Sequence, residues 1–202
     1  TEITSEDIHH VLRRTKSDPI FELTNAMADR NKIQALFFLN TLLRDQYHPL
    51  QIMTAIANQV RKLLVAKDFA QSEVATGWHA SLSFNAFQQS VMPAVVAYDQ
   101  ELLNILEGWD NSVSHAGDAD KKASRSKGKK KKKTQTDLLL ARNPKNAYPV
   151  YQLLKKSERF SKTELVAAVG FLNETDAQLK ISAQNPKLIL ERLIFRICNP
   201  PS

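Results

Sequence analysis

The sequence predicts an all-α protein, and three observations lead to that prediction. The apolar residues are mostly Leu, Ala, Ile and Val, and the 202 residues include only 5 Gly, a mixture that favours helix over sheet. Apolar residues recur every three or four positions over long stretches, which is typical of helices buried along one face. No stretch shows the apolar/polar alternation of strands. A chain that is 43% hydrophobic can bury the core of one domain plus an appendage.

The first helices are expected to begin at recognisable capping residues. Thr4 or Ser5, with Asp7 behind it, precedes a short apolar pattern and is expected to cap it. Asp18 followed by proline predicts the start of a second helix, and Asn31 predicts the start of a third. Pro49 opens a long fourth helix. Each helix is too apolar on one face to be stable alone, so we expect these helices to pack together.

The middle of the chain differs from its two ends. Residues 71–82 are predicted to be a loop, and Ser83 caps a helical stretch that should end at Gly108. Pro93 inside that stretch should kink or split it, because proline has no N–H and clashes with the preceding turn. Residues 110–136 contain almost no large apolar residue. Such a segment cannot bury enough surface to become ordered, so we interpret it as a disordered connector.

The remainder of the chain is predicted to form three further helices. Residues 143–149 are a turn with two prolines, and residues 150–160 are expected to be helical. Ser161 and Glu164 form a capping box that begins a helix with Leu165, Ala168, Val169, Leu172 and Leu179 on one stripe. Asn185, followed by proline, starts the last helix.

Positive charge is concentrated in one short segment. The net charge of +7 looks like that of a nucleic-acid-binding protein, but residues 121–133 hold eight Lys and one Arg without any acid. The remaining 19 basic residues (28 less nine) are outnumbered by 21 acidic ones. The segment could be a solvated connector, a flexible arm that binds phosphate loosely, or a nuclear localisation signal. The expected nonspecific phosphate contacts are Lys129, Lys130, Lys131, Lys132 and Lys133.

The sequence carries no motif for catalysis, for a cofactor or for a metal. Gly128-Lys129 is the nearest fragment of a phosphate-binding loop, but positions 123 and 130 do not fit it. None of the five histidines lies in a metal-binding spacing. The single cysteine, Cys198, allows no internal disulfide and fits a reducing, cytoplasmic setting. We see no apolar run long enough to span a membrane. We therefore expect no catalytic, cofactor-binding or metal-binding residue.

One charged residue falls on a predicted apolar stripe. Asp176 takes a position where leucine would be expected, and Lys180 lies four residues further on. Arg61 falls in line with the apolar residues of the fourth helix and is a second candidate partner. We expect a structural ion pair among these residues. A catalytic acid at Asp176 is the weaker alternative, because no second acid or base is spaced to assist it.

Two blocks of the sequence, residues 20–69 and 143–198, together resemble one family. They contain IFELTNA, a helix with ALFFLNTLL, the PLQI helix with Gln59 and Arg61, RFS followed by EL, and DAQLK before a proline-led helix. In this order they are similar to the C-terminal part of the delta subunit of the bacterial DNA polymerase III clamp loader. The resemblance implies an all-helical collar domain over residues 17–202, preceded in residues 1–16 by the end of a lid domain. Residues 71–142 depart from the family pattern and are interpreted as an insertion.

The resemblance also implies a function. The chain is expected to be a non-catalytic, cytoplasmic subunit that joins other clamp-loader subunits through the collar and supports sliding-clamp loading in DNA replication. It would contact DNA only indirectly or weakly, and it would not contact a membrane. The alternative is a stand-alone helical nucleic-acid-binding protein that uses residues 121–133. A helical enzyme is a third class, and it has only Asp176 to support it.

Overall fold

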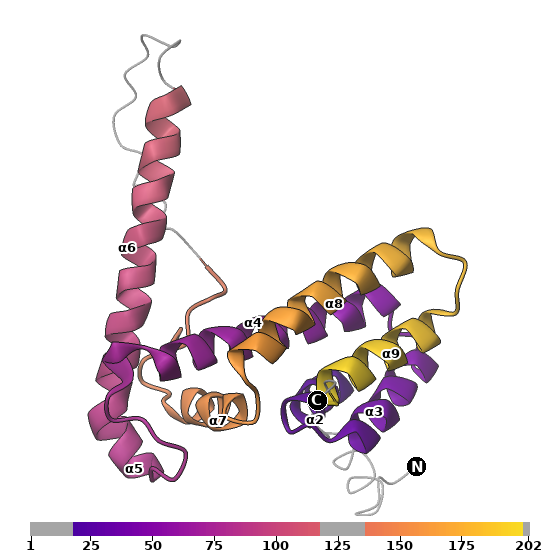
Figure 1. The fold of residues 1–202 in the computed structure, drawn as a ribbon, viewed down its shortest axis with the longest axis horizontal. Helices are drawn as coiled ribbons and strands as arrows, with labels where there is room; N and C mark the ends of the chain where they lie inside the picture. Colours follow the sequence, from indigo (N-terminus) through magenta and orange to yellow (C-terminus); the bar gives the residue numbers. More distant parts are fainter. Residues whose placement is uncertain (1–17, 118–135, 200–202) are drawn as a thin grey trace, which may run out of the picture. The chain divides into compact units, whose positions relative to one another are not determined.

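The fold is entirely helical in the part of the chain that can be described. The computed structural model describes residues 18–117 and 136–199, and these two ranges contain helices and turns but no strand (Figure 1). The predicted all-α class is confirmed. The short helix expected after Ser5, the lid segment 1–16 and most of the lysine-rich connector lie outside the described residues. The chain divides into two compact units, residues 1–64 with 156–202 and residues 65–155.

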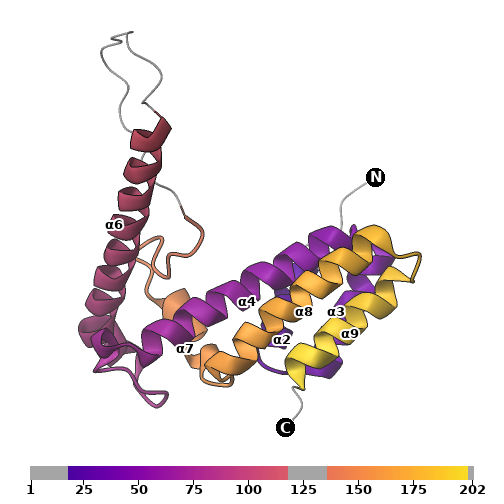
Figure 2. The ribbon, with the colours of Figure 1, turned by 45° about the horizontal axis from the view of Figure 1, so that its top comes forward.

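The first unit is a bundle of helices from both ends of the chain. It contains α2 (Pro19–Ala28), α3 (Lys32–Arg44), the first part of α4 (Pro49–Gln71), α8 (Lys162–Ile181) and α9 (Pro186–Cys198). Helix α3 packs against both α2 and α9, and α8 packs against α9 (Figure 2). Segments far apart in the sequence therefore form one core.

The helices of the first unit begin where the capping residues predict. Asp18 accepts a hydrogen bond from the Ile20 amide at 3.0 Å, and Asn31 accepts one from the amide of Gln34 at 3.1 Å. The predicted caps of the last two helices, at Ser161 and Asn185, are also formed. Each cap satisfies an amide that has no partner within its own helix, so these helix starts are set locally.

The buried stripe of α8 is rotated from the predicted one. The structure buries Leu165, Ala168, Leu172 and Thr175. Val169 is 42% exposed, and Leu179 is only partly buried. Asp176 is therefore not on the buried stripe, and the prediction that it replaces a core leucine is wrong. The core position of that turn is held by the adjacent Thr175.

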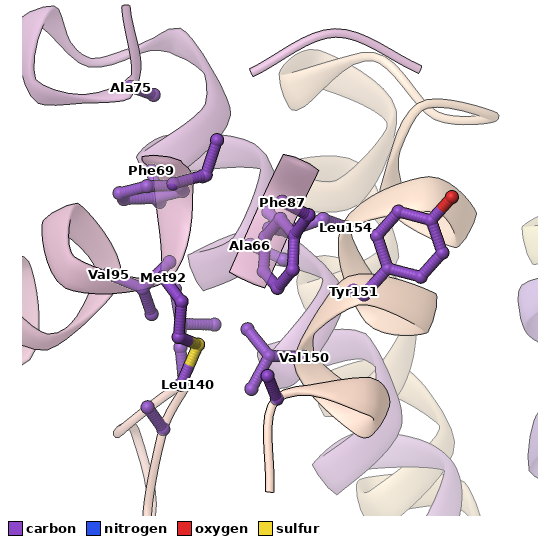
Figure 3. Close-up of a cluster of buried hydrophobic side chains, with 13 residues drawn as sticks. Ala66, Phe69, Ala75, Phe87, Met92, Val95, Leu140, Val150, Tyr151 and Leu154 are labelled. Atoms are coloured by element: carbon purple, nitrogen blue, oxygen red, sulfur yellow. The ribbon is translucent and has the colours of Figure 1, made fainter. Parts of the chain in front are cut away.

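The second unit has a core of its own. It contains the end of α4, the short helix η1 (Glu73–Ala75), α5 (Phe84–Ala86), the π-helical turn η2 (Phe87–Val91), α6 (Met92–Gly117) and most of α7 (Tyr148–Ser157). Its buried side chains come from α4, η1, η2, α6, α7 and the segment before α7, and Phe84 of α5 packs against them (Figure 3). They are Ala66, Phe69, Ala75, Phe87, Val91, Met92, Val95, Leu140, Ala141, Ala147, Val150, Tyr151 and Leu154. The range 71–142, which we interpret from the sequence as an insertion, thus contributes to a packed core.

Helix α6 differs in length from the prediction. It continues past Gly108 to Gly117, so residues 110–117 are helical, and their assignment to a disordered connector is wrong. A glycine inside an exposed helix weakens the helix without ending it. Pro93 is the second residue of α6 and directly follows the π-helical turn, so the hydrogen-bond pattern of the helical stretch changes just before the proline. The stretch is not split, because residues 84–117 stay helical and the Met92 amide bonds to the Phe87 carbonyl five residues earlier.

Candidate partner-binding surface

The predicted ion pair is on the surface of the first unit. Lys180 Nζ lies 2.7 Å from Asp176 Oδ2, and the two side chains are 56% and 34% exposed, respectively. Exposed pairs spaced four residues apart on a helix contribute only about 0.3–0.5 kcal/mol. Arg61 is exposed on α4, and no ion pair joins it to Asp176. The arrangement around Asp176 holds two opposite charges and lacks the buried acid–base geometry of a catalytic site.

The other predicted contact residues cannot be placed. Lys129, Lys130, Lys131, Lys132 and Lys133 all lie outside the described residues. Within residues 18–117 and 136–199, no group of three or more His, Cys, Asp or Glu side chains is arranged to hold a metal ion. None of the helices described there is both long enough and apolar enough to span a membrane.

A cluster around Arg30, which the sequence did not reveal, fixes the turn between α2 and α3 against the start of α8. Arg30 has a left-handed backbone (φ 55°), and its guanidinium lies 4.2 Å from the centre of the Phe160 ring. It donates hydrogen bonds to the Arg159 carbonyl and to Glu164 Oε2, both at 2.7 Å. A buried aromatic face and a carboxylate thus hold the same cation.

Glu164 links this cluster to the capping box of α8. Its Oε2 also accepts a hydrogen bond from the Ser161 amide at 2.6 Å, and the Ser161 hydroxyl accepts one from the Glu164 amide. Burial opposes ionisation of Glu164, but the hydrogen bonds from Ser161 and Arg30 outweigh it and hold the pKa of this carboxyl below its ordinary value. The ionised carboxylate therefore stabilises the folded state. The capping box was visible in the sequence, but its distant partner Arg30 was not.

Asp99 has a comparable role in the second unit. It is 5% exposed, and its two carboxylate oxygens accept hydrogen bonds from the amides of Leu140 and Ala141 at 2.9 and 2.7 Å. Burial raises the pKa of Asp99, and the two backbone hydrogen bonds oppose that rise. Asp99 therefore holds Leu140 and Ala141, which lie shortly after the described chain resumes at residue 136, against helix α6. No pattern in the sequence signals this role, because Asp99 resembles an ordinary surface acid.

Aromatic side chains fill the second unit. Trp78 packs edge-to-face on Phe87 with ring centres 5.9 Å apart, and Phe87 lies 5.3 Å from Tyr151. Tyr98 packs on Phe69 and donates a hydrogen bond to Asp68. Burial and this hydrogen bond raise the pKa of Tyr98. These aromatic residues therefore lie in the core or pack against it, whereas Trp109 is 64% exposed.

The side of α8 that faces away from the core carries exposed apolar residues beside the polar Asn173 and Glu174. Val166 is 55% exposed, Val169 42% and Ile181 85%. Gly170 and Ala177 are also exposed on this side, and a side chain added at Gly170 would meet no atom within 4 Å. We call these five residues the α8 outer face. It extends over about 22 Å of helix at 1.5 Å per residue. An apolar face of this length is typical of a surface that packs against another helix.

Two other helices of the same unit expose large apolar side chains. On α3, Ile33 and Phe37 lie one turn apart and are 76% and 65% exposed. On α9, Leu188 and Phe195 lie two turns apart and are 59% and 47% exposed. Single exposed apolar residues are common, but repeated pairs at helical spacing indicate protein–protein contact. The first unit therefore exposes surfaces suited to protein–protein contact.

Comparisons with known proteins point to a particular assembly. Residues 17–87 match the family model described as the DNA polymerase III delta subunit, C-terminal domain. Over 70 residues the chain is 36% identical to the DNA polymerase III subunit delta of Bacillus subtilis (strain 168). The resemblance inferred from the sequence is confirmed for this region, which covers the first of the two blocks. No solved structure matches the chain significantly.

The extent of these matches is limited. The aligned region is 35% of this chain and 20% of the Bacillus subtilis protein. The family match continues to residue 87 and so includes the start of the range interpreted as an insertion. The second block, residues 143–198, lies outside the matched residues. In the structure its helices α8 and α9 complete the bundle that α2 and α3 begin.

Proposed function

We propose that this chain is the C-terminal collar region of a clamp-loader delta subunit. In this role it would bind neighbouring loader subunits in the bacterial cytoplasm and support the loading of sliding clamps during DNA replication. It would contribute by assembly and not by catalysis. The observation that carries the proposal is the match of residues 17–87 to the family of delta-subunit domains.

The structure supports this proposal through the α8 outer face. The face exposes Val166, Val169 and Ile181, its helix begins with a capping box, and Gly170 leaves room for another helix backbone to approach. Each of Val166, Val169 and Ile181 would contribute roughly 1–3 kcal/mol to the binding free energy when buried against a partner. An interface between subunits on this face would therefore be strongly weakened by a single buried charge.

The proposal is tested by assembly of the full-length protein with the other loader subunits. Val169→Asp should weaken assembly by at least about tenfold, because it places an unpaired carboxylate in the interface. Val74→Asp is the matched control, since Val74 is a valine with the same 42% exposure in the second unit. Assembly should be unchanged in that control. If the unaltered protein does not join the other subunits, the proposed function is wrong. If both variants assemble normally, the function stands and the α8 outer face is not the interface.

A further inference from the structure

The later turns of α6 carry apolar residues that are exposed or only partly buried in the described structure. Met92, Val95 and Asp99 are buried near the start of the helix, but no residue from 100 to 112 is buried. Both views show α5, α7 and the end of α4 near the first turns of α6, with the later turns extending away from them (Figure 1 and Figure 2). Five large apolar residues nevertheless lie between 102 and 109. An exposed helix that needed only solubility would carry polar residues there.

The exposed apolar residues form a stripe on one side of α6. Ile105 is 45% exposed and Trp109, four residues later, is 64% exposed. Gly108 lies beside Trp109, and a side chain added at Gly108 would meet no atom within 4 Å. A glycine inside a helix costs about 0.5–1 kcal/mol relative to alanine, and no packing within the described chain requires this one. It does leave the helix backbone open to close approach by another molecule. We call Ile105, Gly108 and Trp109 the α6 stripe.

The charges on α6 restrict what can bind the stripe. Met92–Gly117 contains no Lys or Arg and four acidic residues, of which Asp99 is buried and Glu107 lies on the other side of the helix from Ile105. Glu101, one turn before Ile105, is exposed, and neither Glu101 nor Glu107 forms an ion pair with any described residue. Negative charge of this kind repels nucleic-acid phosphates and anionic lipid. It also disfavours a second copy of the helix, since the acidic residues of the two copies would face each other.

The chain's own lysine-rich segment offers positive charge but no apolar pocket. Residues 118–135 contain no apolar residue larger than alanine, so they supply no large apolar side chain for Ile105 and Trp109 to pack against. Tryptophan is among the residues that contribute most binding energy at protein interfaces when it enters an apolar pocket. The occupant must therefore supply both an apolar pocket and positive charge.

We propose that the α6 stripe is a docking site for a protein partner whose contact surface is an apolar groove or helix face edged by Lys or Arg. Trp109 and Ile105 fill the apolar part of the partner, Gly108 allows its backbone to approach, and Glu101 pairs with a basic residue at the edge. The site belongs to the second unit and does not depend on the proposed collar function. An experiment can therefore refute the docking site on α6 while the proposed collar function holds, and the reverse is also possible.

The experiment is site-specific photo-crosslinking with the full-length protein in cells that produce it at its natural level. A photoreactive phenylalanine analogue replaces Ile105 in one protein and Val96 in a matched control. Val96 is an apolar residue on another side of α6 with a similar exposure of 37%. We expect a protein adduct from position 105 at a yield at least about tenfold above that from position 96. The crosslinked peptide of the partner should contain a large apolar residue and Lys or Arg within one helical turn.

Two further variants test the proposed contacts. Trp109→Ala and Glu101→Lys, each combined with the crosslinker at position 105, should lower the adduct yield by roughly tenfold or more. Both residues are exposed, so the circular dichroism and melting temperature of the variants should match those of the unaltered protein. Adducts only with a second copy, with nucleic acid or with lipid would overturn the proposal. It would also be overturned by equal yields from positions 105 and 96, by no adduct, or by yields that neither variant changes.

Discussion

Replacing Asp99 with asparagine tests how the chain after residue 135 is held to α6. The two carboxylate oxygens accept the Leu140 and Ala141 amides at 2.9 and 2.7 Å in a site where Asp99 is 5% exposed. Asparagine has nearly the same shape, but its side-chain NH₂ group is a donor. That group would face one of the two backbone amides, which is also a donor. One buried amide is then left without an acceptor, which costs about 1–3 kcal/mol. For a chain of this size that cost lowers the melting temperature by roughly 2–12 °C.

Hydrogen exchange followed residue by residue is the assay for this prediction, combined with thermal unfolding. We expect the amides of residues 140 and 141 to lose protection in Asp99→Asn, whereas amides inside α4 keep most of theirs. Glu107→Gln is the control, because it removes an exposed acid from the same helix and should change stability by no more than about 0.5 kcal/mol. Equal stability of Asp99→Asn and the unaltered protein, with unchanged exchange at both amides, would refute the reasoning.

Three further predictions concern the first unit. Arg30→Ala removes the stacking on Phe160 and two hydrogen bonds and should cost about 2–4 kcal/mol in urea unfolding. Arg30→Gly should cost about 1 kcal/mol less, since glycine adopts the left-handed backbone freely, and equal losses would contradict this account. The pKa of Glu164 is lowered in the folded state, so its contribution is present above the ordinary pKa of 4.5 and is lost as the pH falls through the folded-state pKa. Glu164→Gln should therefore cost about 1 kcal/mol at pH 7 and progressively less below pH 4.5, and a pH-independent difference would count against it. Asp176→Ala should change stability by less than about 0.5 kcal/mol, because its pair with Lys180 is exposed, and a loss several times larger would show that Asp176 has another structural role.

Local features of the fold were predictable, because they depend on residues close together in sequence. The helix starts at Asp18, Asn31, Ser161 and Asn185 follow from side chains that satisfy nearby amides. The irregular π-helical turn just before Pro93 is consistent with the missing N–H of proline. The all-α fold class was equally predictable, since it depends on the spacing of apolar residues along the sequence.

Contacts between distant segments were not predictable in the same way. The spacing of apolar residues on α8 is compatible with two neighbouring buried stripes, one that includes Thr175 and one that includes Asp176. Packing against the other helices buries the stripe with Thr175. The core of the second unit joins Phe69 to Leu154, and no local pattern indicates that these residues meet. The roles of Arg30 and Asp99 are likewise created by partners far along the chain. In the sequence, each is only a charged residue among others.

The most direct test of the central claim is native mass spectrometry of the full-length protein mixed with the other subunits of its clamp loader. The account predicts a stable complex that contains this protein at a fixed stoichiometry and that Val169→Asp weakens. A protein that stays free under conditions in which the other subunits assemble would contradict the account.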